Sequence, residues 1–330
     1  MSSFISIIIP CRNEEEYIKD CLDSLIGQDY PNDNLEILVI DGMSTDKTRE
    51  IVKGYCEKYP FIKLLDNSEI FTPYALNIGV KESRGEVLVR IDAHAKYKKD
   101  YVSKCIEHLE ESGADNVGGI IKTIPKNDSV IAKSIAFCLS HPFGVGSAFF
   151  RMDMSKPREV DTVFGGCYKK EIFDKVGLFN EKLKRSQDIE LNSRIRKEGG
   201  KIMLFPDIVS YYYPQTSLTG FLKHNFTDGI WSTYPLKFDV KIFSFRHLIP
   251  LIFILLLLSS FFLGFIFTFF SFVFSLISFL YLLAIVVFSF SIARRENNWD
   301  YLFVMPIVFL IRHFGYGLGS LWGLIKSKIK

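Results

Sequence analysis

The sequence lacks the cysteine pattern of a zinc protein or a disulfide-stabilised protein. Its six cysteines are scattered, and no two of them form a Cys-x-x-Cys pair, which excludes the common zinc-site spacings. An excess of basic residues is also missing, since 40 lysines and arginines stand against 37 aspartates and glutamates, for a net charge of +3. Without a strongly basic surface, nucleic-acid binding is not expected.

An N-terminal signal sequence is a third absence. No basic region precedes a long apolar stretch, and the apolar run Phe4–Ile9 is too short for a signal peptide. We therefore expect the N-terminal domain to stay in the cytosol. In that reducing compartment the cysteines are expected to remain thiols.

Charged residues are absent from Leu248 to Ala293. A bilayer core of about 30 Å takes roughly 20 helical residues. The stretch therefore predicts two transmembrane spans, about 249–270 and about 272–292. A buried core helix is the alternative, but an uninterrupted apolar run of this length argues against it.

The charges around these spans predict their orientation. Arg246 precedes the first span and Arg294-Arg295 follow the second, so the positive-inside rule places both flanks in the cytosol. Tyr301–Ile325 is also apolar but contains Arg312, and a third full span would bury that arginine near the bilayer centre at roughly 2.5–3.5 kcal/mol. We therefore expect a re-entrant or interfacial helix over about 301–325 and a cytosolic C-terminus, in a multi-pass protein of the cell membrane.

The first part of the chain alternates short β-rich runs with helical patterns. Strands are predicted at Phe4–Ile9, Leu35–Ile40, Phe61–Leu65, Glu86–Ile91 and Asn116–Ile121. Helices are predicted at Glu14–Ile26, Lys47–Tyr59, Pro73–Glu82, Asp100–Glu111 and Asp188–Glu198. This order is typical of an α/β fold, Rossmann-like, with a mostly parallel sheet and helices on both faces. We expect a cytosolic domain over 1–215, an amphipathic interfacial region over 216–247 and a membrane segment over 248–330.

A carboxylate and an imidazole, Asp92 and His94, directly follow the predicted strand Glu86–Ile91. Residues two apart on extended backbone face the same side. The carboxyl ends of strands in an open α/β sheet are where ligands bind. The pair could therefore hold one divalent cation, although an isolated Asp-x-His is usually an ordinary loop sequence.

Two segments end the first two predicted strands. The segment from Pro10 through Arg12 to Glu14 opens a helix, so its backbone N–H groups suit an anion or a polar ring, or simply cap the helix. Asp41 emerges from the second strand, where a carboxylate can accept the ring N–H of a uracil. Asp46 more plausibly caps the next helix.

Three further positions carry candidate residues with open alternatives. Asn77 could face a nucleotide or cap a turn. Gly165 and Gly166 bring the backbone close to a small group, which is either a sugar or a tight bend. Asp188 begins a helix, where a carboxylate is stabilised as the anion. That setting suits a helix cap and a general base equally.

In this order, the segments resemble the inverting nucleotide-sugar glycosyltransferases of family 2, which have the GT-A fold. The matching residues are Ile-Ile-Pro-Cys-Arg-Asn-Glu up to Glu14, Asp41-Gly-x-Ser-x-Asp-x-Thr, Ala75-x-Asn77-x-Gly79, Gly85-Glu86 with Asp92, and Gln187-Asp188. Later segments resemble the subgroup typified by the succinoglycan glucosyltransferases of bacterial exopolysaccharide assembly. They are Asp92-Ala93-His94-Ala95, His141-Pro142-Phe143-Gly144-Val145-Gly146, Asp161-Thr162-Val163, Gln187-Asp188-x-Glu190-Leu191-Asn192-x-Arg194, Arg246-His247 and His313-x-x-Tyr316-Gly317-x-Gly319.

Two departures from the family pattern bear on the chemistry. The usual metal motif is Asp-x-Asp, whereas here its last member is His94. Imidazole is a competent ligand for first-row divalent ions and a poor one for Mg²⁺, so Mn²⁺ is favoured over Mg²⁺; polypeptide N-acetylgalactosaminyltransferases carry a comparable Asp-x-His. The residue before the base is more often Glu, and here it is Gln187. Because the aspartate abstracts the proton, Asp188 keeps the assignment.

The resemblance implies a membrane-anchored hexosyltransferase. It would move a sugar from a UDP-sugar to a lipid-linked (polyprenyl) saccharide, with inversion, in the assembly of an extracellular or cell-surface polysaccharide. Asp188 would be the general base, and Asp92 and His94 would hold the metal on the diphosphate. The nucleotide-sugar site would comprise Pro10, Arg12, Glu14, Asp41, Asn77, Asp92, Gly165 and Gly166. Other polysaccharide-assembly proteins are candidate partners.

Two alternatives stay open at this point. An enzyme that transfers a sugar to polyprenyl phosphate itself needs no base, because the phosphate is already a nucleophile, and Asp188 would then be structural. A catalytically degenerate scaffold of the assembly complex would fail to bind UDP in the presence of Mn²⁺. No motif encodes the donated sugar, the exact acceptor or the linkage.

Overall fold

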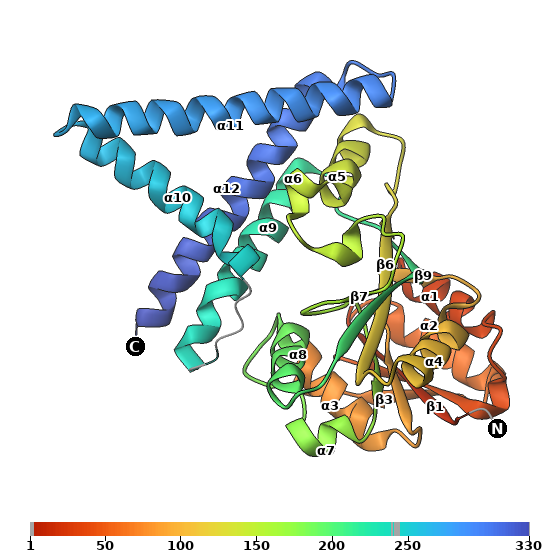
Figure 1. Cartoon of the computed structure of the whole chain (residues 1–330). Helices are drawn as coiled ribbons and strands as arrows, with labels where there is room; N and C mark the ends of the chain where they lie inside the picture. Colours follow the sequence, from red (N-terminus) through yellow and green to blue (C-terminus); the bar gives the residue numbers. More distant parts are fainter. Residues whose placement is uncertain (1–2, 239, 241–244, 330) are drawn as a thin grey trace. The chain divides into compact units, whose positions relative to one another are not determined.

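The computed structural model describes residues 3–238, 240 and 245–329. The chain forms two compact units, shown in Figure 1. The first unit comprises Met1–Lys122 and Phe149–Tyr212, and the second comprises Thr123–Ala148 and Tyr213–Lys330.

The first unit is built on one sheet, which has nine strands within the described residues. They are β1 (Ile5–Cys11), β2 (Leu35–Asp41), β3 (Ile62–Asp66), β4 (Val87–Arg90), β5 (Ala95–Tyr97), β6 (Asn116–Thr123), β7 (Arg158–Glu159), β8 (Cys167–Lys169) and β9 (Ile202–Tyr212). Their order is β3-β2-β1-β4-β8-β6-β9-β5, with β7 paired to β9. Strands β3, β2, β1 and β4 run parallel. Strand β8 is antiparallel to β4 and β6, and β5 and β7 are antiparallel to β9.

Helices cover both faces of this sheet. They are α1 (Ile18–Ile26), α2 (Thr48–Lys58), α3 (Thr72–Glu82), α4 (Tyr101–Ser112), α7 (Ile172–Val176) and α8 (Gln187–Lys197), with 3-10 turns η1 (Asn32–Asn34) and η2 (Phe149–Arg151). Alternate residues of a strand point to opposite faces, so Ile7 and Ile8 of β1 lie in two separate apolar clusters. The first cluster includes residues of α1, α2 and α4, and the second includes residues of α3, α7 and α8.

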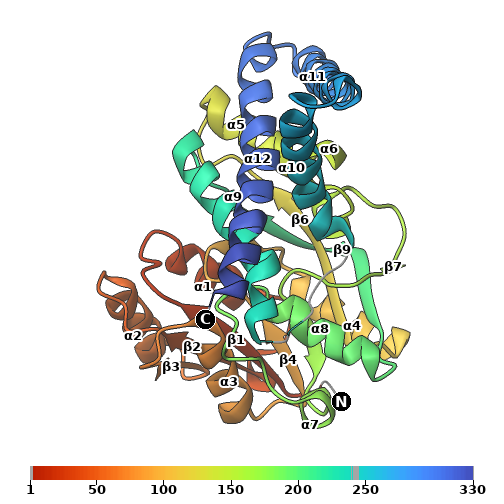
Figure 2. The ribbon, with the colours of Figure 1, turned by 90° about the vertical axis from the view of Figure 1, so that its left-hand side faces the viewer.

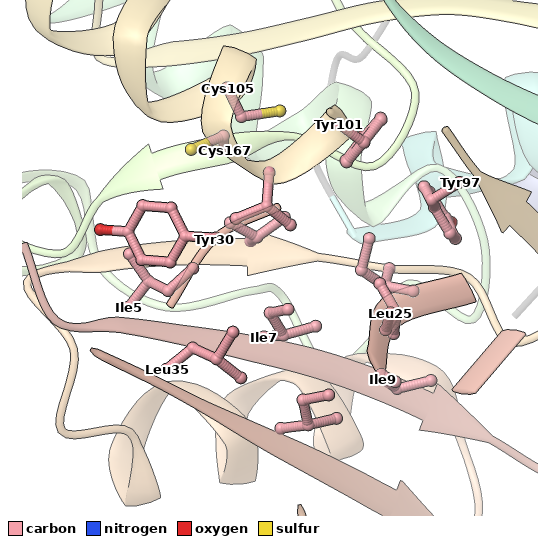
Figure 3. Close-up of a cluster of buried hydrophobic side chains, with 14 of the residues drawn as sticks. Ile5, Ile7, Ile9, Leu25, Tyr30, Leu35, Tyr97, Tyr101, Cys105 and Cys167 are labelled. Atoms are coloured by element: carbon pink, nitrogen blue, oxygen red, sulfur yellow. The ribbon is translucent and has the colours of Figure 1, made fainter. Parts of the chain in front are cut away.

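The first cluster holds the parallel strands against their helices. Ile5, Ile7 and Ile9 of β1 are fully buried, together with Leu25 of α1 (Figure 3). Burying a side chain of this size contributes about 1.5–3 kcal/mol relative to leaving it exposed. This packing fixes the strands whose ends carry the candidate residues. All six cysteines lie in the described part of the chain, and each is a free thiol.

The expected fold class is confirmed. The five predicted strands correspond to β1, β2, β3, β4 and β6, and the predicted helices correspond to α1, α2, α3, α4 and α8. Strands β5, β7, β8 and β9 were not predicted. Their antiparallel pairing joins segments far apart in the chain, which local alternation of residue types does not report.

The second unit is helical. Its elements are α5 (Val130–Ser140), α6 (Pro142–Val145), α9 (Leu218–Thr233), η3 (Tyr234–Phe238), α10 (Phe245–Gly264), α11 (Thr268–Arg295) and α12 (Tyr301–Lys328). Among the described residues, three helices are long and apolar enough to cross a membrane by length and composition, namely Arg246–Gly264, Thr268–Arg295 and Tyr301–Lys328. The last of these is one continuous helix of 28 residues that contains Arg312.

Helices α9 and α12 lie side by side in both views (Figures 1 and 2). Their backbones approach so closely that a Cβ on Gly229 of α9 or on Gly319 of α12 would collide with the other helix. The hydroxyls of Ser232 and Ser320 lie 3.0 Å apart across the same interface. Small residues with hydroxyl contacts are the packing that apolar helices use in lipid.

Candidate active site

Three parallel strands end at one edge of the sheet and place the candidate residues there. In the register of the sheet, Pro10 is opposite Ile40 and Cys11 is opposite Asp41, while Ile8 pairs with Arg90 at the end of β4. Asp92 follows β4 by two residues. The carboxyl ends of β1, β2 and β4 therefore bring the three predicted segments together, as the position of ligand sites in open α/β sheets requires.

The loops after β1 and β2 are hydrogen-bonded to each other. The Asn13 N–H donates to the Ser44 hydroxyl at 2.9 Å, and the Thr45 N–H donates to the Asn13 side-chain oxygen at 2.8 Å. The Glu15 N–H donates to Asp46 at 3.1 Å. Asp46 also accepts from the N–H of Thr48 at the start of α2, at 3.0 Å, which confirms its helix-capping role.

Asp41 is buried beneath these loops. Its carboxylate is fully shielded, and it accepts hydrogen bonds from the Ser44 N–H at 3.0 Å and from Arg49 at 2.7 Å. The Ser44 hydroxyl donates to its other oxygen. Pro10 is half-buried and Arg12 is exposed. The structure thus shows Asp41 holding the loop after β2, with Pro10 near the end of β1 and Arg12 on the loop that follows it.

The turn after β4 carries Asp92 and His94. Their side chains are 16% and 39% exposed, respectively. His94 Nδ1 lies 3.2 Å from a carboxylate oxygen of Glu14. Burial alone would lower the pKa of His94, but this hydrogen bond and the negative charges of Asp92 and Glu14 outweigh it and raise the pKa. Because Nδ1 is engaged by Glu14, Nε2 is the nitrogen left for a metal.

Arg90 is the residue that sequence reasoning missed. Its guanidinium is 10% exposed and lies between two carboxylates, with Nη2 3.1 Å from Asp92 Oδ1 and Nη1 3.5 Å from Asp188 Oδ2. Burial alone would lower the pKa of Arg90, but the charges of Asp92 and Asp188 raise it. Its Nε and Nη1 are buried without a hydrogen bond within the described residues, so the approach of Nη1 to Asp188 is an ion pair without a hydrogen bond. One cation therefore joins the expected metal ligand to the expected base.

Asp188 occupies the first turn of α8 and remains 27% exposed. Ser186 before the helix has a left-handed backbone, with φ of 62°, and directs the chain into that turn. Exposure leaves the carboxylate able to meet a substrate hydroxyl, while Arg90 contacts one of its oxygens.

The backbone of Gly165 and Gly166 lies against the backbone of Arg90. The Gly166 carbonyl accepts from the Arg90 N–H at 2.9 Å, and a Cβ on Gly165 would lie 2.7 Å from the Arg90 carbonyl oxygen. Both glycines have positive φ, 68° and 114°, which other residues adopt only with strain. The close approach expected of this segment is thus made to the protein's own strand.

Asn77 is positioned differently from the expectation. It is buried, and its amide donates to the Phe179 carbonyl at 3.0 Å and to the Glu181 carboxylate at 2.9 Å. Its oxygen accepts from the Phe179 N–H at 2.9 Å. Both ends of the amide are committed within the protein, so the expected nucleotide contact is replaced by a structural role in fixing the loop after α7.

Comparison with known protein families matches residues 6–177 to the family described as glycosyl transferase family 2. The chain belongs to this family. A dolichyl N-acetyl-alpha-D-glucosaminyl phosphate 3-beta-D-2,3-diacetamido-2,3-dideoxy-beta-D-glucuronosyltransferase of Methanococcus voltae is 34% identical over 334 residues, which cover 98% of each chain. The succinoglycan biosynthesis protein ExoA of Rhizobium meliloti is 29% identical over 247 residues, 70% of this chain and 74% of its own.

Solved structures support the same fold for this family 2 glycosyltransferase. Mannosyltransferase PcManGT from Pyrobaculum calidifontis, solved with GDP-Man and Mn²⁺, has a TM-score of 0.60 and covers 98% of this chain and 88% of its own, at 17% identity. S. aureus TarS 1-349, solved with UDP-GlcNAc, has a TM-score of 0.51 and covers 69% of this chain and 66% of its own, at 19% identity. At these identities the likeness shows the GT-A-like fold alone.

GT-A glycosyltransferases generally use a divalent metal, and the donor set of this chain fits one. No cluster of three or more His, Cys, Asp or Glu side chains suited to a metal occurs within the described residues. Asp92 and His94 offer two ligands on one turn, which suits an ion that takes its remaining ligands from a diphosphate and water.

Proposed function

We propose that this glycosyltransferase transfers a sugar from a UDP-sugar to a saccharide carried on a polyprenyl phosphate. The name of the Methanococcus voltae relative describes transfer to a dolichyl-phosphate-linked sugar, and it aligns over 98% of this chain. The three apolar helices support an acceptor that resides in a membrane. The geometry that carries the proposal is the junction of Asp92, Arg90 and Asp188 at the carboxyl end of β4.

In the proposed reaction Asp188 is the general base. Its exposed carboxylate oxygen takes the proton from the acceptor hydroxyl as that hydroxyl attacks the anomeric carbon from the face opposite UDP. A positioned base of this kind contributes about 10²–10⁴-fold in rate. Inversion follows because attack and departure occur on opposite faces.

Asp92 and His94 would hold a divalent ion for the diphosphate, and Mn²⁺ would be favoured because one ligand is an imidazole. When bound, the metal neutralises charge on the leaving UDP. Glu14 orients the imidazole through Nδ1. Pro10, Arg12 and the loop anchored by Asp41 line the nucleoside side, and the backbone around Gly165 and Gly166 supports Arg90 on the sugar side.

The proposal predicts the effect of Asp188→Asn. The substitution keeps the shape and removes the base, so transfer to the lipid-linked acceptor should fall at least about 10²-fold, while UDP affinity in Mn²⁺ stays within a few-fold. The measurements are single-turnover transfer and UDP binding on full-length protein in lipid nanodiscs. Retention of more than about a tenth of wild-type turnover would place proton abstraction elsewhere. A protein that binds no UDP in Mn²⁺ would support the scaffold alternative.

We also propose that the catalytic unit and the C-terminus lie on the cytosolic side. Basic residues at Arg246 and Arg294-Arg295 support this orientation. A cysteine added after Lys330, in a variant lacking other reactive thiols, should resist membrane-impermeant thiol reagents in intact cells. Ready labelling there would mean that α12 crosses the bilayer and the C-terminus faces outward.

A further inference from the structure

Within the described residues, the contacts of the Arg312 guanidinium are made to uncharged groups. It lies near the middle of α12, where Nε donates to the Gly144 carbonyl at 2.8 Å and Nη1 donates to the side-chain oxygen of Asn225. Its guanidinium also lies 5.5 Å from the ring centroid of Tyr316. None of these three partners carries a negative charge. An arginine within an apolar helix is costly, so such residues mark ligand pathways more often than packing positions.

A second arginine converges on the same turn. Arg246, in the first turn of α10, donates from Nη1 to the Ser147 carbonyl at 3.1 Å. The turn Gly144–Ser147 therefore accepts hydrogen bonds at both ends from guanidinium groups of two different helices. Between these ends lies Gly146, which has φ of 60° and open space where a side chain would stand.

The packing of α10 against α12 shows where the two arginines lie along the helix pair. Phe253 and Phe314 meet edge-to-face with ring centroids 5.8 Å apart, and a Cβ on Gly317 would meet the Pro250 backbone. The two helices are thus antiparallel, with Pro250 level with Gly317. Arg312 lies five residues from Gly317 along α12, about 7 Å beyond Pro250 at 1.5 Å per residue, whereas Arg246 lies four residues before Pro250 on α10.

The Arg246 end of the cluster lies where polar chain meets apolar chain. Arg246-His247 are the last polar residues before the apolar run that begins at Leu248. Arginine side chains are long enough to reach such a boundary from either side of it. This boundary is the level at which the phosphate groups of membrane lipids reside.

We propose that Arg246 and Arg312, over the open turn Gly144–Ser147, bind the phosphate of the lipid-linked acceptor. The proposal rests on the proposed function and names where the acceptor's anionic group is held. Guanidinium groups bind phosphate oxygens through paired, charge-assisted hydrogen bonds. Nε and Nη1 of Arg312 donate to Gly144 and Asn225, and its Nη2 has no hydrogen bond within the described part of the chain, so it remains for this contact.

The test measures binding of radiolabelled polyprenyl monophosphate to full-length protein in phosphatidylcholine nanodiscs. Arg312→Gln and Arg246→Gln should each weaken binding at least tenfold and raise KM for the lipid-linked acceptor, with KM for the UDP-sugar unchanged. Arg294→Gln is the matched control, since Arg294 is an exposed arginine at the end of α11; it should bind as wild type. Arg312→Lys retains the charge and should lose less than Arg312→Gln.

Competitors decide what the site recognises. Polyprenol without phosphate should compete at least tenfold less well than polyprenyl monophosphate, and inorganic phosphate should compete only at far higher concentration. Equal competition by polyprenol, equal competition by inorganic phosphate, or unchanged binding by both glutamine variants would each overturn the proposal. If Arg312→Gln fails to fold, Arg246→Gln and Arg312→Lys carry the same comparison.

The outcome is separable from that of the proposed function. UDP binding in Mn²⁺ is measured on the same samples. Wild-type protein that binds polyprenyl monophosphate but no UDP would contradict the proposed donor and would still support this phosphate site. Normal sugar transfer with an unchanged acceptor KM in both glutamine variants would contradict the phosphate site and leave the proposed function unaffected.

Discussion

Arg90→Gln removes the cation that joins Asp92 to Asp188. The side chain of Arg90 contacts one oxygen of each carboxylate, at 3.1 and 3.5 Å. Without that contact Asp188 can turn away from the acceptor hydroxyl, and a misplacement of about 1 Å costs roughly 10²-fold in rate. We therefore expect kcat to fall about 10²-fold, with the whole 10²–10⁴-fold contribution of a general base as the upper limit.

Arg90→Gln should also lower the free energy of unfolding. Breaking a buried ion pair by removing one partner costs about 3–5 kcal/mol. The two carboxylates left behind are 16% and 27% exposed, so water offsets part of that cost and about 3 kcal/mol is the most we expect. Mn²⁺ with UDP should restore part of the lost stability, because the ion supplies positive charge beside Asp92.

A double-mutant cycle separates orientation of the base from a general loss of structure. Kinetics at saturating Mn²⁺ would compare Arg90→Gln, Asp188→Asn and the double variant. If Arg90 acts through Asp188, the double variant should be no slower than Asp188→Asn within about threefold, and Arg90→Lys should recover part of kcat. Arg84→Gln is the matched control, since Arg84 pairs with the buried Glu36, and its kcat should be unchanged. Multiplicative losses in the double variant would refute the reasoning.

Three further results are expected. His94→Asp should shift the metal preference from Mn²⁺ toward Mg²⁺, because a carboxylate replaces an imidazole ligand; full activity of the wild type in excess chelator would contradict the metal site altogether. The pKa of His94 is raised above its ordinary value of 6.5, so protons begin to compete with the metal already above pH 6.5. Mn²⁺ affinity measured by titration should therefore fall as the pH is lowered through that range. His94→Asp should move this loss of affinity to lower pH. Gly319→Leu should collide with the Phe226 backbone and destabilise the detergent-solubilised protein by about 1–3 kcal/mol, whereas Leu318→Ala, at an exposed position of the same helix, should leave the melting temperature nearly unchanged.

The strands, and the edge at which they present ligands, were predictable from local patterns. Apolar runs of five or six residues between helical periods indicate a parallel sheet, and polar residues just after those runs indicate its ligand-binding edge. That reasoning placed Asp41 and Asp92 at the carboxyl ends of β2 and β4, the two strands that flank β1. It also identified Asp46 as a cap, because a carboxylate before a helix has a local partner.

The rest depended on contacts between distant segments. Asn77 was expected at the nucleotide, but its amide pairs with Phe179 and Glu181 about a hundred positions along the chain. A side chain of this kind is satisfied by whatever backbone folds over it, and the sequence carries no local sign of that partner. Nor did residue patterns indicate that Thr123–Ala148 belongs with the second unit.

Arg90 did leave a signal. It follows Val87-Leu88-Val89 in an otherwise apolar, fully buried strand. A charged residue at such a position is rarely buried unless it is paired. Asp92 is a neighbour along the chain, whereas Asp188 becomes a partner only when α8 is placed beside β4. The basic residue could have been singled out from the sequence, whereas its second partner required the fold.

Under the proposed function, the mutual hydrogen bonds between the loops after β1 and β2 have a consequence for how the donor nucleotide binds. Asn13, Ser44 and Thr45 hold one another by backbone-to-side-chain bonds in both directions, so neither loop has to be ordered by the nucleotide. Immobilising a flexible side chain on binding costs about 0.5–1.5 kcal/mol, and a wall already rigid before the encounter avoids that entropy loss. Such a preorganised wall discriminates by shape, and it would respond to a wrong base by rejecting it rather than by adapting to it.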